Sequence, residues 1–61
     1  MIDLEKRERA RYTLLKKLEE LSEKYPNLRV GQLILNAVAA EQLYYLENEE
    51  LQAALEKLYE P

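Results

Sequence analysis

Three polar residues interrupt an apolar stretch of the sequence at a spacing that could read DNA bases. Arg29, Gln32 and Asn36 lie within "YPNLRVGQLILNAVAA", residues 25–40. On a helix, with about 100° per residue, they fall within about 60° of one another. Arginine pairs with guanine, and glutamine or asparagine with adenine, in the major groove of DNA. The stripe therefore gives one hypothesis, a nucleic-acid-binding helix-turn-helix module that uses this second helix.

The charge of the chain favours a different interpretation of the same stripe. The net charge is −3 and the isoelectric point is about 4.9, whereas phosphate contacts by basic residues supply much of the affinity for nucleic acid. Arg29 is the single basic residue between positions 28 and 42. We therefore favour the interpretation that the stripe is the polar side of a core helix and faces either water or a subunit interface. At an interface, Asn36 could fix the register of two chains.

Enzymatic chemistry has few candidate residues in this sequence. The chain has neither histidine nor cysteine, so it lacks the commonest general base and any thiol nucleophile. Ser22 and Thr13 can have no histidine beside them, and a single glycine excludes a glycine-rich phosphate loop. The glutamate pair Glu19 and Glu23 is typical of a solvated helix face. We expect no catalysis, no cofactor, no metal and no small-molecule ligand.

Two arginines stand where an apolar helix face would be expected to continue. Arg7 and Arg11 project on the same face as three leucines further along the first helix. That helix, at roughly 30 Å, would overhang its shorter neighbours. The arginines would then either lie in solvent or reach acidic groups of another chain. The leucines are Leu14, Leu18 and Leu21, and the acidic candidates are Glu47, Glu49 and Glu50.

The charges are divided unevenly along the chain. Residues 1–17 carry a net charge of +3 and the remaining residues carry −6, so the two parts attract each other. The basic part could lie near the acidic last helix of its own chain, or it could bind an anionic partner.

Several features predict a cytoplasmic protein without a membrane segment. The lack of cysteine fits a reducing compartment. The charged start, "MIDLEKRERAR", lacks the apolar core of a signal peptide. The longest uncharged run covers residues 30–40 and is much shorter than the roughly 20 residues that span a bilayer.

The periodicity predicts an all-helical chain with three helices. Leucines and a tyrosine recur at one face from Leu14 to Tyr25, and Pro26 ends this first helix. Asp3 could cap it, Asn27 could cap a second helix from Leu28 to about residue 42, and Asn48 could cap a third. The third helix has an apolar stripe at Leu51, Ala54, Leu55 and Leu58. We expect one domain, 1–61, as a three-helix bundle or a helical hairpin with a short third helix.

The second helix is apolar on more sides than two short helices can cover. A chain of 61 residues without disulfides or metal also needs further stabilisation, for which self-association is a common source. We therefore predict a homodimeric protein-interaction module that binds another protein. The expected core and interface residues are Leu14, Leu18, Leu33, Ile34, Ala37 and Val38, with Arg29, Gln32 and Asn36 as polar contacts and Arg7, Arg11, Glu49 and Glu50 as charged contacts.

Two local features give narrower expectations. Gly31 lies in the first turn of the second helix, where it either permits the close approach of another group or has no particular role. Tyr44, Tyr45 and Leu46 lie in the link before the third helix. We expect at least two of these three to fold over the core, although paired tyrosines can also form a docking surface.

The segments "YPNLRVGQLILNA" and "LYYLENEELQAALEKL" resemble a pattern in short bacterial and phage proteins of unassigned function. In that pattern a helix ends at proline, "LR-x-GQ" opens the next helix, and an aromatic and acidic link precedes the last one. The resemblance covers roughly residues 24–60. It implies an all-helical fold and no particular activity.

Overall fold

The computed structural model describes the backbone of residues 2–61 and the side chains of residues 4–61. This part of the chain folds into four helices and no strand, which confirms the predicted all-helical class. The helices are α1 (Ile2–Lys24), α2 (Val30–Ala37), α3 (Ala40–Leu43) and α4 (Asn48–Tyr59). No helix in the described part has both the length and the apolar character needed to span a bilayer.

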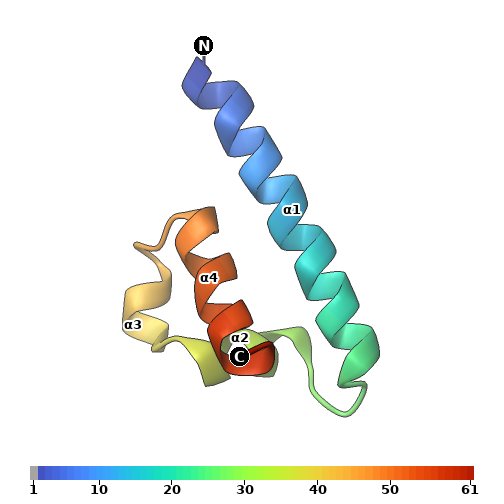
Figure 1. Cartoon of the computed structure of the whole chain (residues 1–61). Helices are drawn as coiled ribbons and strands as arrows, with labels where there is room; N and C mark the ends of the chain where they lie inside the picture. Colours follow the sequence, from blue (N-terminus) through green and yellow to red (C-terminus); the bar gives the residue numbers. More distant parts are fainter. Residues whose placement is uncertain (1) are drawn as a thin grey trace.

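Helix α4 packs beside the C-terminal half of α1, and α2 closes the same end of the molecule (Figure 1). α1 and α4 run in the same direction, and the N-terminal half of α1 projects beyond the start of α4. This projection makes the molecule elongated, with extents of 39 × 25 × 20 Å.

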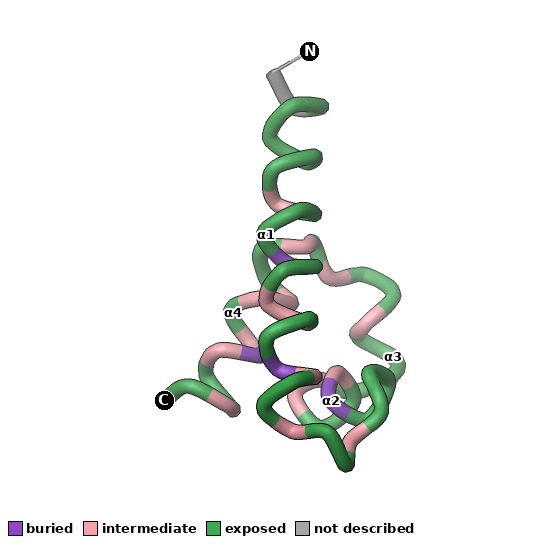
Figure 2. Tube along the Cα trace, turned by 90° about the vertical axis from the view of Figure 1, so that its right-hand side faces the viewer, coloured by how far each residue is buried: buried purple, intermediate pink, exposed green. Residues whose placement is uncertain are grey.

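Four leucines form the buried core, and they come from three helices. α1 contributes Leu14 and Leu21, α2 contributes Leu33 and α4 contributes Leu55. Figure 2 shows the buried positions in the part of the molecule where these helices meet. The predicted apolar face of α1 is confirmed, with Leu18 and Tyr25 packed around the core. The face predicted for α4 is confirmed at Leu51 and Leu55, whereas Leu58 is 46% exposed. Each face forms because apolar residues three and four apart lie on one side of a helix.

The start of α2 differs from its prediction. α1 ends at Lys24, as Pro26 predicts, but the next residues form a turn in which the Leu28 amide donates to the Tyr25 carbonyl at 3.0 Å. Asn27 is therefore a turn residue and not the N-cap. The N-cap is Arg29, whose backbone amide donates to the Gln32 side-chain oxygen at 2.8 Å. The residue that marks the start of this helix in the sequence is therefore the glutamine three residues after the cap, and not the expected asparagine.

The expected second helix, from Leu28 to about residue 42, is broken into α2 and α3. Val38 and Ala39 both have extended backbones, although neither proline nor glycine marks the break. A β-branched valine tolerates extended backbone well. The break also reverses the chain, so that α3 and residues 44–47 return to the start of α4 (Figure 1). A straight helix would have carried this segment away from α1.

Two other predicted caps are also displaced. Asp3 lies within α1, which begins at Ile2, so it does not precede the helix as a cap; its side chain is outside the described residues. Asn48 is the first residue of α4, and the N-cap is Glu47. The Glu47 backbone amide donates to the Glu50 carboxylate at 2.8 Å, which satisfies one of the free amides at this end of the helix.

The two tyrosines of the link do not fold over the core, contrary to expectation. Tyr44 is 87% exposed and Tyr45 is 79% exposed, whereas Leu46 is half-buried. The two rings pack edge to face, with centroids 5.1 Å apart. The partly buried side chains of this segment are Leu43, the last residue of α3, and Leu46, and the two rings between them remain in solvent.

No other group approaches Gly31 closely, since a Cβ at this position would meet no atom within 4 Å. Its φ is not positive, so alanine fits the same backbone. We expect Gly31→Ala to raise the free energy of unfolding by about 0.5 kcal/mol, because alanine loses less conformational entropy in a helix. Urea unfolding followed by circular dichroism measures the change. A lower stability would contradict the open surroundings of Gly31.

Candidate functional site

The polar stripe of α2 is exposed, and two of its three residues bind groups of their own chain. Gln32 accepts the hydrogen bond from the Arg29 amide, and the Asn36 side-chain amide donates to the Tyr59 hydroxyl at 3.5 Å. Arg29 itself lies at the exposed start of the helix. The stripe therefore belongs in part to the capping and packing of α2. The helix that would enter a DNA groove has eight residues.

Tyr59 links α4 to α2 and to the residue that directly follows α1. Its hydroxyl donates to the Leu33 carbonyl at 2.9 Å, and its ring lies 5.2 Å from that of Tyr25 at 45°. The apolar stripe predicted for the last helix ends at Leu58 and omits this residue. The signal for Tyr59 was available, because it follows the buried Leu55 by four residues and so shares its face.

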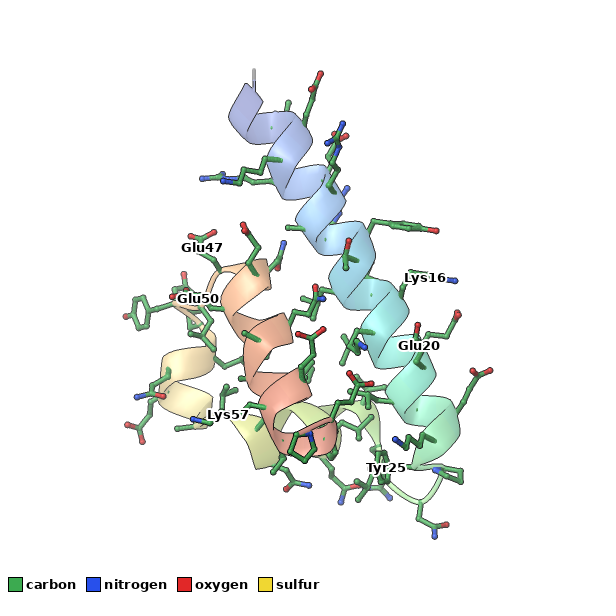
Figure 3. The ribbon with its side chains drawn as sticks, viewed as in Figure 1. Lys16, Glu20, Tyr25, Glu47, Glu50 and Lys57 are labelled. Carbon is green, nitrogen blue, oxygen red and sulfur yellow. The ribbon has the colours of Figure 1, made fainter. Side chains whose placement is uncertain are left out.

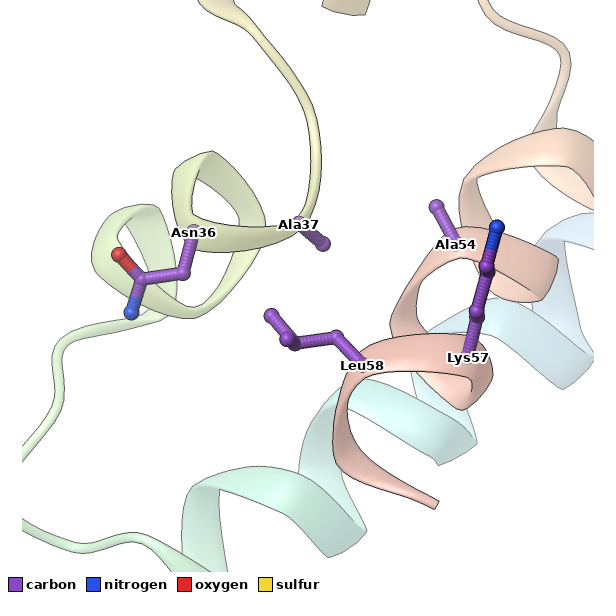
Figure 4. A pocket seen from close by; sticks show the side chains of 5 residues that line it. All are labelled: Asn36, Ala37, Ala54, Lys57 and Leu58. Carbon is purple, nitrogen blue, oxygen red and sulfur yellow. The ribbon is translucent and has the colours of Figure 1, made fainter. Parts of the chain in front are cut away.

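A hollow of about 440 Å³ lies between α2 and α4. It is lined by Asn36 and Ala37 from α2 and by Ala54, Lys57 and Leu58 from α4. Figure 4 shows Leu58 reaching from α4 toward the side of Ala37. Small and apolar side chains form most of this surface, and polar groups lie at its edges. The hollow is therefore an open and mostly apolar groove.

The predicted interface residues divide between the core and the surface. Leu14 and Leu33 are buried within the chain, so these two side chains are not free to contact a partner, whereas Leu18 and Ala37 pack against that core and are only partly buried. Ile34 and Val38 are half-buried. The exposed apolar side chains of this region are instead Val30, Leu35 and Leu58. Periodicity could not separate these groups, because nearly every side of α2 is apolar.

The four predicted charged contacts do not meet within one chain. Arg7 and Arg11 are exposed on the projecting part of α1, and Glu49 and Glu50 are exposed at the start of α4. Among the side chains described, none of these four takes part in an ion pair. The Glu50 carboxylate also accepts the cap hydrogen bond of α4.

Lys17, in the basic part of the chain, forms ion pairs with glutamates of the acidic part. Its ammonium lies 2.8 Å from the Glu60 carboxylate, 3.6 Å from that of Glu20 and 3.9 Å from that of Glu56. The hydrogen bond to Glu60 is the main cause that raises the pKa of Lys17. A raised pKa in the folded state stabilises the fold below the ordinary value of 10.5, and this contribution is lost only at higher pH.

No group of three acidic side chains in the described part of the chain is arranged to hold a metal ion. Neither a family model, nor a curated protein, nor a solved structure matches this chain.

Proposed function

We propose that this chain is a small helical protein-interaction module that associates with itself and acts by binding another protein. One observation carries the proposal. Among the described side chains the buried residues are four leucines, whereas eight large hydrophobic side chains are at least 46% exposed. A core of this size gives a chain of 61 residues little stability, and a partner that covers exposed apolar groups stabilises it further.

The apolar surface around α2 and α4 supports this choice of partner. Leu35 lies on the opposite side of α2 from Leu33 and is about half exposed, as are Val30 and Leu58. Leu58 also lines the groove between the helices. Water-exposed apolar groups on neighbouring helices are typical of surfaces that bind protein. The lack of cysteine suits action in the cytoplasm.

Nucleic acid is the less favoured partner. The Gln32 oxygen that would contact adenine already accepts a hydrogen bond from Arg29, and the net charge of −3 repels phosphate. Retardation of random duplex DNA at low salt by micromolar protein would revive the helix-turn-helix alternative, because non-specific binding needs no particular base sequence.

We expect the chain, of mass 7.3 kDa, to sediment at twice that mass as its concentration rises from about 1 μM to about 1 mM. Its thermal midpoint should rise over the same range, because association stabilises the folded state by mass action. Sedimentation equilibrium and circular dichroism measure the two effects. A folded species that keeps the mass of one chain throughout the range would refute self-association.

A further inference from the structure

The N-terminal half of α1 has a helix face without a partner. We define the arm as residues 4–13, which are all exposed except the half-buried Ala10, and Leu14 is the first buried residue after it. Ten helical residues extend for roughly 15 Å. Figures 1 and 2 show this part of α1 projecting away from the other helices. No other element in the described part of the chain covers it.

The uncovered face continues the core face of α1, but its chemistry changes from apolar to basic. Leu4, Arg7 and Arg11 precede Leu14 at spacings of three and four residues, so they share its side of the helix. Leu4 remains exposed. Within the arm, four basic residues outnumber two acidic ones. The arm therefore presents one apolar side chain and two arginines where α4 would otherwise pack.

An acidic surface with exposed aromatic rings lies at the start of α4. We define the ledge as residues 41–50, which include four glutamates and the tyrosine pair, and no basic residue occurs between Arg29 and Lys57. Figure 3 shows Glu47 and Glu50 at the end of α4 that faces the projecting part of α1. Among the described side chains, no ion pair involves the arm or the ledge.

We propose that two copies of this chain pair through their arms, antiparallel about a two-fold axis, so that Arg7 and Arg11 of each copy contact the ledge of the other. The inference rests on the proposed self-association and names its surface. The arm extends beyond the start of its own α4. A two-fold arrangement brings each arm to its partner's ledge and uses both surfaces twice.

The chemistry of the two surfaces fits this occupant. Arginines form hydrogen-bonded pairs with carboxylates and stack on aromatic rings, and the ledge offers glutamates beside the exposed Tyr44 and Tyr45. Leu4 gains apolar contact from the second arm. A polyanion would instead meet Glu5 and Glu8 among the arm's basic residues, which favours a partner of mixed charge.

Charge reversal on each surface tests the pairing. The arm variant is Arg7→Glu with Arg11→Glu. The ledge variant is Glu47→Lys with Glu49→Lys, which replaces the N-cap side chain of α4 but keeps the Glu50 carboxylate that accepts the backbone hydrogen bond of residue 47. Each variant alone should dimerise about a hundredfold more weakly than the original chain, because like charges then face each other. The matched control, Glu19→Lys with Glu23→Lys, changes the same charge on exposed positions outside both surfaces and should dimerise normally.

Mixing the two variants should restore association. The acidic arm of the arm variant then meets the basic ledge of the ledge variant. The unchanged basic arm of the ledge variant meets the unchanged acidic ledge of the arm variant, so both contacts pair opposite charges. Sedimentation equilibrium gives the dissociation constants, and native mass spectrometry distinguishes the mixed dimer by mass. Circular dichroism checks that every variant is helical, and a single chain carrying all four substitutions should also dimerise.

Three outcomes would overturn the pairing, and they differ in what else they affect. If the original chain dimerises and both variants dimerise equally well, the arm and ledge are not the interface, but self-association stands. If the original chain stays monomeric at about 1 mM, both the pairing and the proposed self-association fail. Failure of the mixture to form a mixed dimer, while each variant stays folded and monomeric, would also overturn the pairing.

Discussion

Replacing Leu55 with alanine is expected to lower the free energy of unfolding by about 3 kcal/mol. Leu55 is 0% exposed and is the single buried residue that α4 contributes to the core. Truncation removes apolar contact with leucines of α1 and α2 and leaves a cavity among them. A core of this size supports only about 3–5 kcal/mol of stability, so about 0–2 kcal/mol should remain and up to about half of the molecules should be unfolded at low protein concentration.

Urea unfolding followed by far-ultraviolet circular dichroism measures this loss. Leu58→Ala is the matched control, because it removes the same atoms from the same helix at a position that is 46% exposed. Its effect should be less than half as large. Equal effects at the two positions would contradict the central place of Leu55. Both measurements should use the same low protein concentration, since association would otherwise add stability.

The second large effect is expected at Tyr59, where two substitutions separate the hydroxyl from the ring. Tyr59→Phe should cost about 1 kcal/mol, because the Leu33 carbonyl loses a donor. Tyr59→Ala should cost about 3 kcal/mol, since the contact with the Tyr25 ring and the core is lost as well. Chemical unfolding of both variants measures the difference.

Tyr44 provides the control for Tyr59. Its ring is exposed and contacts Tyr45 in the link, so Tyr44→Phe and Tyr44→Ala should each change the stability of the single chain by less than about 0.5 kcal/mol. If Tyr59→Phe were as neutral as Tyr44→Phe, the hydrogen bond from Tyr59 to α2 would contribute nothing to the fold. The same Tyr44→Ala variant should weaken dimerisation if the ledge binds an arginine of a second chain.

Much of the candidate surface could be recognised from the sequence because charge and apolar spacing are visible there. The arginines on the face of Leu14 and the glutamates near the start of the last helix were both predicted as charged contacts. Which leucines face a partner could not be predicted. Leu33 and Leu35 are two residues apart on a helix that is apolar on nearly every side, and only packing against Leu55 buries the first while leaving the second exposed.

The sequence by itself determined the helical class, the end of α1, the apolar face of α1 and part of that of α4, because these depend on residues close together in the chain. Proline excludes helix at the preceding residue, and apolar spacing of three and four marks one helix face. The tertiary structure alone decided the break at Val38, the exposure of the tyrosine pair and the contact of Tyr59 with Leu33. These features follow from the return of the chain to α1, which brings together groups that are distant in sequence.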